Sequence, residues 1–442
     1  MAASSVCSER KMQWLLPLTA LSVQLTSLAY RLGVFQMIVA YRWQLLGFVL
    51  LMQGMVMGVT VFCFGFFVVH WMEEFSAERG LFMLAYTGMM IVNAILSPVA
   101  GMWIDRYSQT MLVLLGLTGF IGGLLLVSVA PVPILILAVY ALLYPFSNSL
   151  AGPLISQALV VRAFEKNRGT ALGICALGAT IGGIVMPVVV TDMLETIDWR
   201  YLSLLLAGIS GLILLPLAFL ILRQAPKRGA SLKKGPEKRA YRELLKNADV
   251  YKIAIATFVP SVFYVAVLLN IGLYAVDLGI SQQQASLIVS MAAGLTVVGK
   301  LLAGWLADNI SHNITYYALC VIIFCSMYLT ATANEFLPLA SGVAVLGTAV
   351  GGVSPFISAV AAQRFGSENY GSVMGLVMGA VSLTGLAPLM AGWVRDFTGS
   401  YEIAFLMFLP LIFLAAISFG RLSKLPEDNT PPQVAKAATG RN

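Results

Sequence analysis

The stretch GMWIDR at residues 101–106 decides the fold, because it returns as GWLADN at residues 304–309. Each copy keeps a glycine and, four positions later, an aspartate, and the copies stand about 200 residues apart. A second pair, AFEKNRGTALG at 163–173 and RFGSENYGSVMG at 364–375, repeats at nearly the same spacing. Two matches in register indicate a duplicated unit.

The composition places both copies in a membrane. Of 442 residues, 59% are hydrophobic and 11% are charged, and the mean hydropathy is +0.87, values that exclude a soluble globular chain. Twelve uncharged runs reach the roughly 20 residues that a spanning helix needs. The sequence therefore predicts an all-α membrane protein with twelve transmembrane helices in two pseudo-symmetric six-helix bundles.

One long basic stretch, RQAPKRGASLKKGPEKRAYRELLKN at 223–247, divides the helices into six and six. The predicted organisation is an N-terminal extension that the fold does not require (1–40), a first bundle (41–222), a basic cytoplasmic linker (223–248), a second bundle (249–420) and a cytoplasmic tail (421–442). The extension has three open interpretations: an interfacial segment, a thirteenth span and a signal peptide. Met37 is an alternative start that would remove residues 1–36.

The charge distribution orients the chain. Its formal net charge is +7, but the basic residues are confined to loops that flank the membrane, so nucleic acid is not the expected partner. Most lie in the loops on one side, ten of them between residues 223 and 252, whereas Arg79, Arg200 and Arg395 lie on the other. The positive-inside rule then predicts a multi-pass protein with both termini cytoplasmic. We expect it in a bacterial inner membrane, with membrane lipids as partners.

Catalytic and cofactor chemistry find no support in the sequence. Four of the five cysteines stand singly in apolar helices, and His70 and His312 are too few and too far apart for a metal cluster. Neither a nucleophile triad nor a phosphate-binding glycine loop occurs. We therefore expect no enzyme, no metal and no cofactor.

The repeat with its basic central linker resembles the major facilitator superfamily over residues 41–420. The signature of that family is matched at Gly101, Asp105 and Arg106, and its second copy keeps Gly304 and Asp308. The resemblance implies a gating role for these residues. Physically, each carboxylate would meet the positive N-terminus of a helix in the other half, near Gly371 for Asp105 and near Gly169 for Asp308.

Arg162 and Arg364 stand at the ends of the fourth and tenth predicted helices, where they can pair with the same carboxylates. Such contacts would exist in one conformation only and would act as a two-state latch. The alternative is that all of these charges are ordinary loop residues in water.

A narrower resemblance rests on VVRAFEKNRGTALG at 160–173, on DWR at 198–200 and on GFFVVHWMEEFSAERG at 65–80. These segments are similar to the monocarboxylate transporter and oxalate/formate antiporter group. In that family an arginine four residues before the glycine of the second signature engages the substrate carboxylate. Lys300 stands at that position before Gly304, so the resemblance implies an anion-binding lysine; a snorkelling lysine is the alternative.

Uncharged polar residues in spanning segments prefer the interior of a bundle. Two pairs at one-turn spacing, Tyr144 with Asn148 and Asn270 with Tyr274, are therefore further candidates for substrate binding, with helix-to-helix hydrogen bonding as the alternative. Glycines at a similar spacing, at Gly169, Gly173 and Gly178 and again at Gly371, Gly375 and Gly379, predict close approach of helices.

The sequence thus predicts a secondary transporter that moves a small organic anion by alternating access. The proton is the expected co-substrate, and exchange without protons is equally compatible. An exporter of drugs or metabolites with the same fold is the alternative within transport, and a non-transporting membrane sensor is the alternative of another class. A monomer can perform this function.

Overall fold

The computed structural model describes residues 41–224 and 238–422, and all of its regular elements are helical. The predictions for residues 1–40 and for most of the tail lie outside these ranges. The first half begins with a helix over residues 41–57 that continues into η1 (Gly58–Phe62), and together they form the first span, Tyr41–Phe62. Its other helices are α2 (Phe64–Phe75), α3 (Arg79–Arg106), α4 (Gln109–Ser128), α5 (Pro133–Ala138), η2 (Val139–Leu143), α6 (Tyr144–Ala151), α7 (Pro153–Ala163), α8 (Arg168–Leu194) and α9 (Trp199–Arg223).

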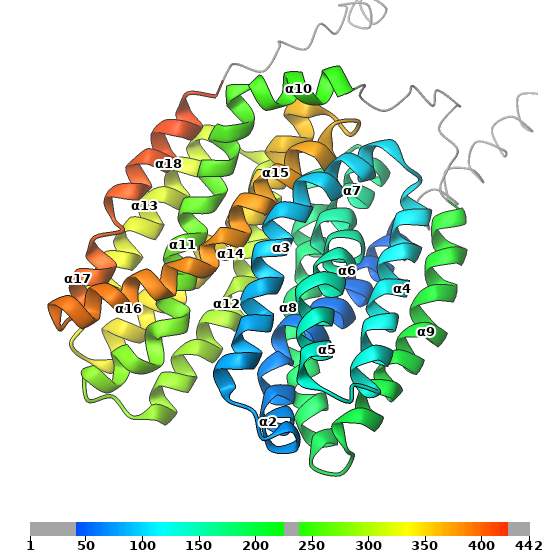
Figure 1. The fold of residues 1–442 in the computed structure, drawn as a ribbon. Coiled ribbons are helices and arrows are strands. Elements are labelled where there is room, and N and C mark those ends of the chain that lie inside the picture. The colour runs from blue at the N-terminus through cyan, green and yellow to red at the C-terminus, as the bar shows by residue number, and fades with distance from the viewer. Residues whose placement is uncertain (1–40, 225–237, 423–442) are drawn as a thin grey trace, which may run out of the picture.

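The second half begins with α10 (Lys238–Lys246), a short helix that lies across one end of the molecule (Figure 1). Its other helices are α11 (Ala248–Asp277), α12 (Gln282–Asn309), α13 (His312–Ala331), α14 (Phe336–Phe365), α15 (Tyr370–Ser382), η3 (Leu383–Leu386), α16 (Ala387–Thr398), α17 (Tyr401–Leu406) and α18 (Pro410–Gly420). We call the end that carries α10 the α10 end, and the opposite end, where α2 lies, the α2 end (Figure 1).

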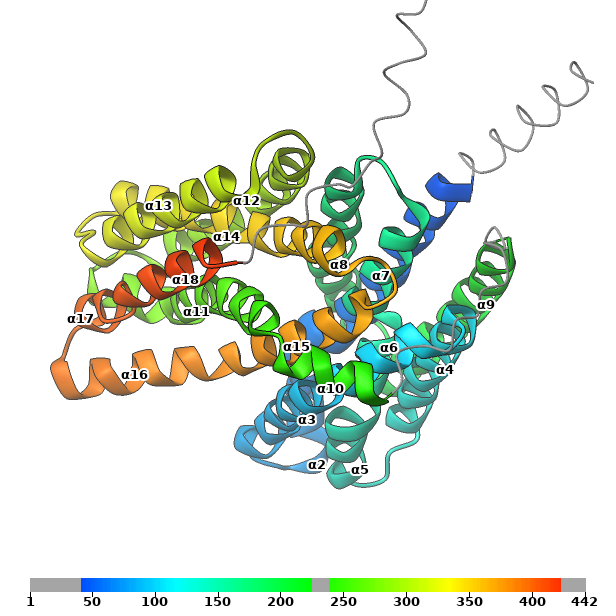
Figure 2. The same ribbon diagram turned by 90° about the horizontal axis from the view of Figure 1, so that it is seen from above.

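Twelve helical segments among the described residues are long and apolar enough to cross a membrane, which confirms the predicted number. Several of them are broken. The fourth span, Pro133–Ala163, runs from α5 to α7 and breaks at Gly152 and Pro153, whereas the eleventh, Tyr370–Thr398, changes from α15 through η3 to α16. Seen from above, α3 to α9 form one group and α11 to α18 another (Figure 2).

Two seams join these groups: α15 packs along α3, and α12 packs along α8. Glycines make the close approach possible, because the backbones themselves are in contact. A Cβ atom on Gly101 would collide with the carbonyl of Gly371, and one on Gly304 would lie 2.5 Å from the carbonyl oxygen of Gly169. Small residues at such contacts are typical of helices that associate in lipid.

The seams predict a different response to alanine at two glycines of the same half. Gly101→Ala forces the α3–α15 seam apart and should destabilise the protein by about 1–3 kcal/mol, the usual range for overpacking. Gly122→Ala on α4 meets nothing within 4 Å and should be neutral or stabilising, since alanine favours a helix over glycine. Thermal unfolding of the purified variants measures the difference, and equal melting temperatures would contradict a packed seam.

Candidate functional site

Asp308 lies at the end of α12 and caps the start of α8 in the other group of helices. Its Oδ1 accepts a hydrogen bond from Gly169 N at 2.7 Å, and its Oδ2 accepts from Thr170 N at 2.7 Å and from Thr170 Oγ1 at 2.8 Å. The N-cap residue of α8, Asn167, has a left-handed backbone and makes no side-chain cap. Two backbone N–H groups in the first turn of α8 therefore find their hydrogen-bond acceptor in the other half of the molecule.

Asp105 makes the same arrangement at the other seam. Its oxygens accept hydrogen bonds from Gly371 N at 2.9 Å and from Ser372 N at 2.6 Å, at the start of α15. The N-cap residue Asn369 again makes no side-chain cap. Arg162 Nη2 lies 3.4 Å from Asp105 Oδ1, and the Asp105 side chain is fully buried, so carboxylate, helix N-terminus and guanidinium form one compact cluster.

The remaining charges of the predicted latch lie around these two caps at the α10 end. Arg162 also donates to the carbonyls of Ile104 and Ser367, which joins the two groups of helices again. Arg364 Nε donates to Asp249 at 3.1 Å, an ion pair within the second half. Arg106 is exposed at the end of α3. The structure thus brings Asp105 and Arg162 together with Gly101 and Gly371 at one seam. At the other seam it brings Asp308 together with Gly169 and Gly304.

Replacing Asp105 by asparagine should loosen the α3–α15 seam. The variant keeps one acceptor but loses the charge, and hydrogen bonds to charged groups contribute about 1.5–3 kcal/mol each. A cysteine introduced at the buried Ser372, in a background without native cysteines, should then react with a maleimide about tenfold faster or more.

Asp192→Asn, at an exposed position of α8, is the matched control for this labelling. It removes an equal charge far from the seam and should leave the rate unchanged. An equal labelling rate in Asp105→Asn and in the native sequence would contradict the assignment of the cap.

At the α2 end, the charged clusters lie within each half. Glu74 accepts hydrogen bonds from Trp199 Nε1 at 2.6 Å and from Arg200 Nη2 at 2.6 Å, which ties the end of α2 to the start of α9. The Arg200 guanidinium lowers the pKa of the Glu74 carboxyl below its ordinary value of 4.5. It also lies over the Trp199 ring, 4.4 Å from the centroid.

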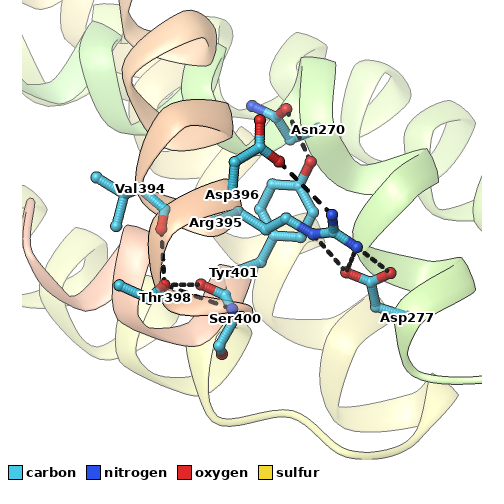
Figure 3. Close-up of polar contacts among 8 residues, drawn as sticks. All are labelled: Asn270, Asp277, Val394, Arg395, Asp396, Thr398, Ser400 and Tyr401. Carbon is cyan, nitrogen blue, oxygen red and sulfur yellow. Dashed lines mark hydrogen bonds and ion pairs between the residues drawn. The ribbon is translucent and has the colours of Figure 1, made fainter.

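The second half carries its own cluster at the same end (Figure 3). Arg395 of α16 contacts both oxygens of Asp277 on α11, at 3.1 and 3.3 Å from Nη2. The guanidinium lies 5.8 Å from the centroid of the Tyr401 ring, and Tyr401 Oη reaches Asn270 Oδ1 at 3.5 Å. This chain of contacts holds α16 and α17 against α11.

The Glu74 cluster should come apart in acid. Because the pKa of Glu74 is lowered by folding, its stabilising contribution is present above the ordinary value of 4.5 and is lost as the pH falls through the lower, folded value. Tryptophan emission should therefore change in that range. Glu74→Gln should abolish the transition, whereas Glu195→Gln, at an exposed position of the same end, should retain it. A transition that survives in Glu74→Gln would have another origin.

Lys300 bridges the α8–α12 seam. Its Nζ donates to Ala176 O at 3.0 Å and to Thr180 Oγ1, whereas its own backbone lies level with Gly173. The side chain therefore extends toward the middle of α8 and away from the α10 end, a direction opposite to that of a snorkelling lysine. Within the described ranges no carboxylate lies at ion-pair distance from Nζ, so uncharged oxygens hold the ammonium.

A cavity of about 480 Å³ lies between the two halves, on the side of the α3–α15 seam. Its polar lining comes from α3, α6, α15 and η3, and all of its lining residues are uncharged. Asn93 Nδ2 donates to Ser382 Oγ at 3.2 Å across the halves, and Ser149 Oγ donates to Asn93 Oδ1 at 3.2 Å. Methionines form much of the remaining wall, at Met57, Met89, Met90 and Met378.

The other predicted binding residues are distributed between this cavity and the interior of the bundles. Asn148 lines the cavity. Tyr144 is buried inside the first half against Phe120, Tyr140 and Gly123.

The two candidates of the second half make hydrogen bonds to backbone carbonyls. Tyr274 Oη lies within 3.3 Å of the carbonyls of Thr330, Ala331 and Ala333. Asn270 Nδ2 donates to Ala266 O and Pro388 O. Tyr144 thus joins helices of the first half, and Asn270 and Tyr274 join helices of the second half.

Sequence reasoning missed the methionine wall and the Thr180 partner of Lys300. Neither has a sequence signal of its own, because apolar residues face lipid and cavity alike. Among the described residues, no group of three or more His, Cys, Asp or Glu side chains is placed to hold a metal ion.

Two helical halves that meet across a cavity, with paired aspartate caps at one end, define a solute transporter of the membrane. The chain belongs to the Major Facilitator Superfamily, whose family model matches residues 48–382 and 253–441. This membership confirms the fold class and the family resemblance inferred from the repeated signature, and the transporters of this family are not enzymes.

The curated relatives include both predicted kinds of transporter. An agnestins efflux protein of Paecilomyces divaricatus is 25% identical over 330 residues, 73% of this chain and 74% of the relative. Monocarboxylate transporter 12 of Rattus norvegicus is 25% identical over 325 residues, 63% of this chain and 65% of the relative. The chain therefore spans slightly less than two thirds of that transporter.

Solved structures share the fold at low sequence identity. A bacterial homologue of the iron transporter ferroportin, in an outward-facing state, aligns with a TM-score of 0.69 at 14% identity, over 86% of this chain and 99% of that chain. A human organic anion transporter aligns with a TM-score of 0.66 at 14% identity, over 87% and 99% of the two chains. At this identity the similarity extends to the fold alone.

Proposed function

We propose that this transporter carries a small organic anion by alternating access and that Lys300 provides the counter-charge for the anion. The observation that carries the proposal is the position of the ammonium, which points into the middle of the seam between the halves. A charged side chain there is unfavourable by several kcal/mol unless a function or a partner favours it. Its present partners, Ala176 O and Thr180 Oγ1, are uncharged, so an anionic oxygen can replace them with a gain in electrostatic energy.

The caps at the α10 end support the second element of the proposal, the alternation. The carboxylates of Asp105 and Asp308 bridge the halves at that end only, whereas the Glu74 and Asp277 clusters lie within one half each. We assign this conformation to the state closed at the α10 end, which the positive-inside rule places in the cytoplasm. Release of the substrate there requires both caps to break, and Arg162 then loses its carboxylate partner.

Coupling to protons rests on the same lysine. Among the described residues no carboxylate lies at ion-pair distance from Nζ, so anion and proton can bind one after the other at the amine. Proton-driven symport and exchange of anions without protons differ in one measurable respect, the response of uptake to a pH gradient.

Uptake into proteoliposomes tests the proposal. Labelled acetate, lactate, benzoate and phenylacetate are supplied with and without an inward proton gradient, to the native protein and to Lys300→Gln. We expect uptake of at least one acid, stimulated by the gradient, and a loss of at least about tenfold in the variant, since a buried charge partner contributes about 2–5 kcal/mol. Lys246→Gln, which removes the charge of an exposed residue of α10, should transport normally.

Normal uptake by Lys300→Gln would remove the lysine from the substrate site. Uptake that ignores the gradient, but is accelerated by unlabelled acid inside the vesicles, would establish anion exchange in place of symport.

Export of an amphipathic metabolite is a second candidate, favoured by the uncharged, methionine-rich lining of the cavity and by the similarity to a fungal efflux protein. Transport of a neutral amphipathic compound, together with no uptake of any acid in the panel, would favour metabolite export over organic-anion transport.

A further inference from the structure

The cavity beside the α3–α15 seam has walls from both halves of the chain. The first half contributes residues of the first span, α3, α6 and α7, and the second half contributes residues of α11, α15 and η3. Its volume of about 480 Å³ falls within the roughly 300–1,000 Å³ of sites that hold drug-sized ligands. A two- or three-carbon acid would leave most of this space unfilled.

One buried amide on this wall has a donor without a good acceptor. Asn148 is 7% exposed and lines the cavity. Its Oδ1 lies 3.1 Å from Thr60 Oγ1, a hydroxyl whose single proton is also within reach of Val56 O at 2.8 Å. Its Nδ2 carries two hydrogens, and the acceptor that the described residues offer is the thioether sulfur of Met89 at 3.9 Å, a weak acceptor at a long distance.

The neighbouring polar groups are better satisfied. Asn93 Nδ2 donates to Ser382 Oγ, and Asn93 Oδ1 accepts from Ser149 Oγ. Ser97 Oγ donates to the carbonyl of Asn93 at 2.7 Å, and Ser382 Oγ donates to that of Met378 at 3.0 Å. Among the lining side chains of the described residues, the Nδ2 of Asn148 and the hydroxyl of Tyr86, which makes no hydrogen bond there, therefore retain hydrogen-bonding capacity. Leaving such a buried donor unused costs about 1–3 kcal/mol.

The remainder of the wall suits an apolar body of adaptable shape. Met57, Met89, Met90 and Met378 line the cavity from both halves, and unbranched thioether side chains rearrange around aromatic or branched groups more readily than stiff aliphatic ones do.

We infer that this cavity binds the aryl or branched alkyl body of an acyl compound, whose acyl oxygen accepts a hydrogen bond from Asn148 Nδ2. In this respect the inference deepens the proposed function, because an organic acid that fits is a hydrophobic monocarboxylate and not acetate or lactate. A ligand in this position contacts both halves and lies beside the Asn93–Ser382 bond that joins them.

Binding to the purified full-length protein in detergent tests this inference without transport. The probes are phenylacetate and 4-phenylbutyrate, their neutral amides, and acetate, with ligand-induced thermal stabilisation as the measurement. The phenyl compounds should stabilise the native protein and acetate should not. Asn148→Ala should weaken the binding of the phenyl compounds about tenfold, whereas Asn313→Ala, at an exposed position of α13, should not.

Val381→Trp provides a second variant in case Asn148→Ala unfolds. It fills the cavity from α15 and should exclude 4-phenylbutyrate more strongly than phenylacetate. Equal stabilisation by acetate and 4-phenylbutyrate, or unchanged binding of the phenyl compounds in both cavity variants, would overturn the inference.

The neutral amides separate this inference from the proposed function. They keep the acyl oxygen but cannot use a counter-charge, so their binding should depend on Asn148 and not on Lys300. Amides that bind to the native protein and to Lys300→Gln, but not to Asn148→Ala, support the cavity assignment even if no acid is transported. Conversely, acetate uptake that depends on Lys300 but not on Asn148 would retain the anion transporter and reject this binding site.

Discussion

Two helices of this protein begin without a cap of their own and receive one from the opposite half. The start of an α-helix presents unsatisfied N–H groups and a partial positive charge, and Asp105 and Asp308 satisfy both at α15 and α8. The contact can form only if the helices approach closely, which the glycines of the seams allow. Cap and glycine contact therefore depend on each other, and the relative position of the halves follows from the two together.

The caps also explain how charge is distributed along the molecule. At the ends, carboxylates and guanidinium groups pair with each other or with helix termini, where water can replace a broken contact. In the middle, among the residues that the structure describes, the Lys300 side chain reaches across a seam and donates to uncharged oxygens. The charges at the closed end are thus paired, whereas the lysine at the centre has no opposite charge beside it. An anion that binds to this lysine can gain electrostatic stabilisation without competing with a structural ion pair.

The sequence predicted the features that depend on spacing. The repeated Gly-x-x-x-Asp pattern identified the duplication, and the helix dipole correctly located Gly371 and Gly169 as neighbours of Asp105 and Asp308. It did not predict which way a polar side chain faces within a bundle. Asn270 and Tyr274 stand one turn apart like Tyr144 and Asn148, yet their acceptors are the carbonyls of Ala266, of Pro388 and of the end of α13, and the positions of such acceptors have no periodic pattern. The roles predicted for these residues stay predictions.

The position of Lys300 and the lining of the cavity impose different demands on a substrate, and the two can be reconciled. A lysine is a point charge that selects the sign of a ligand without fixing its shape. The cavity has shape, an apolar surface and the amide of Asn148, but no charge. Selectivity for size and for hydrophobic character would therefore come from the α3–α15 side, and selectivity for charge from the α8–α12 side. Because each side is a seam between the halves, any molecule that satisfies both demands binds to the elements that must separate before it can leave.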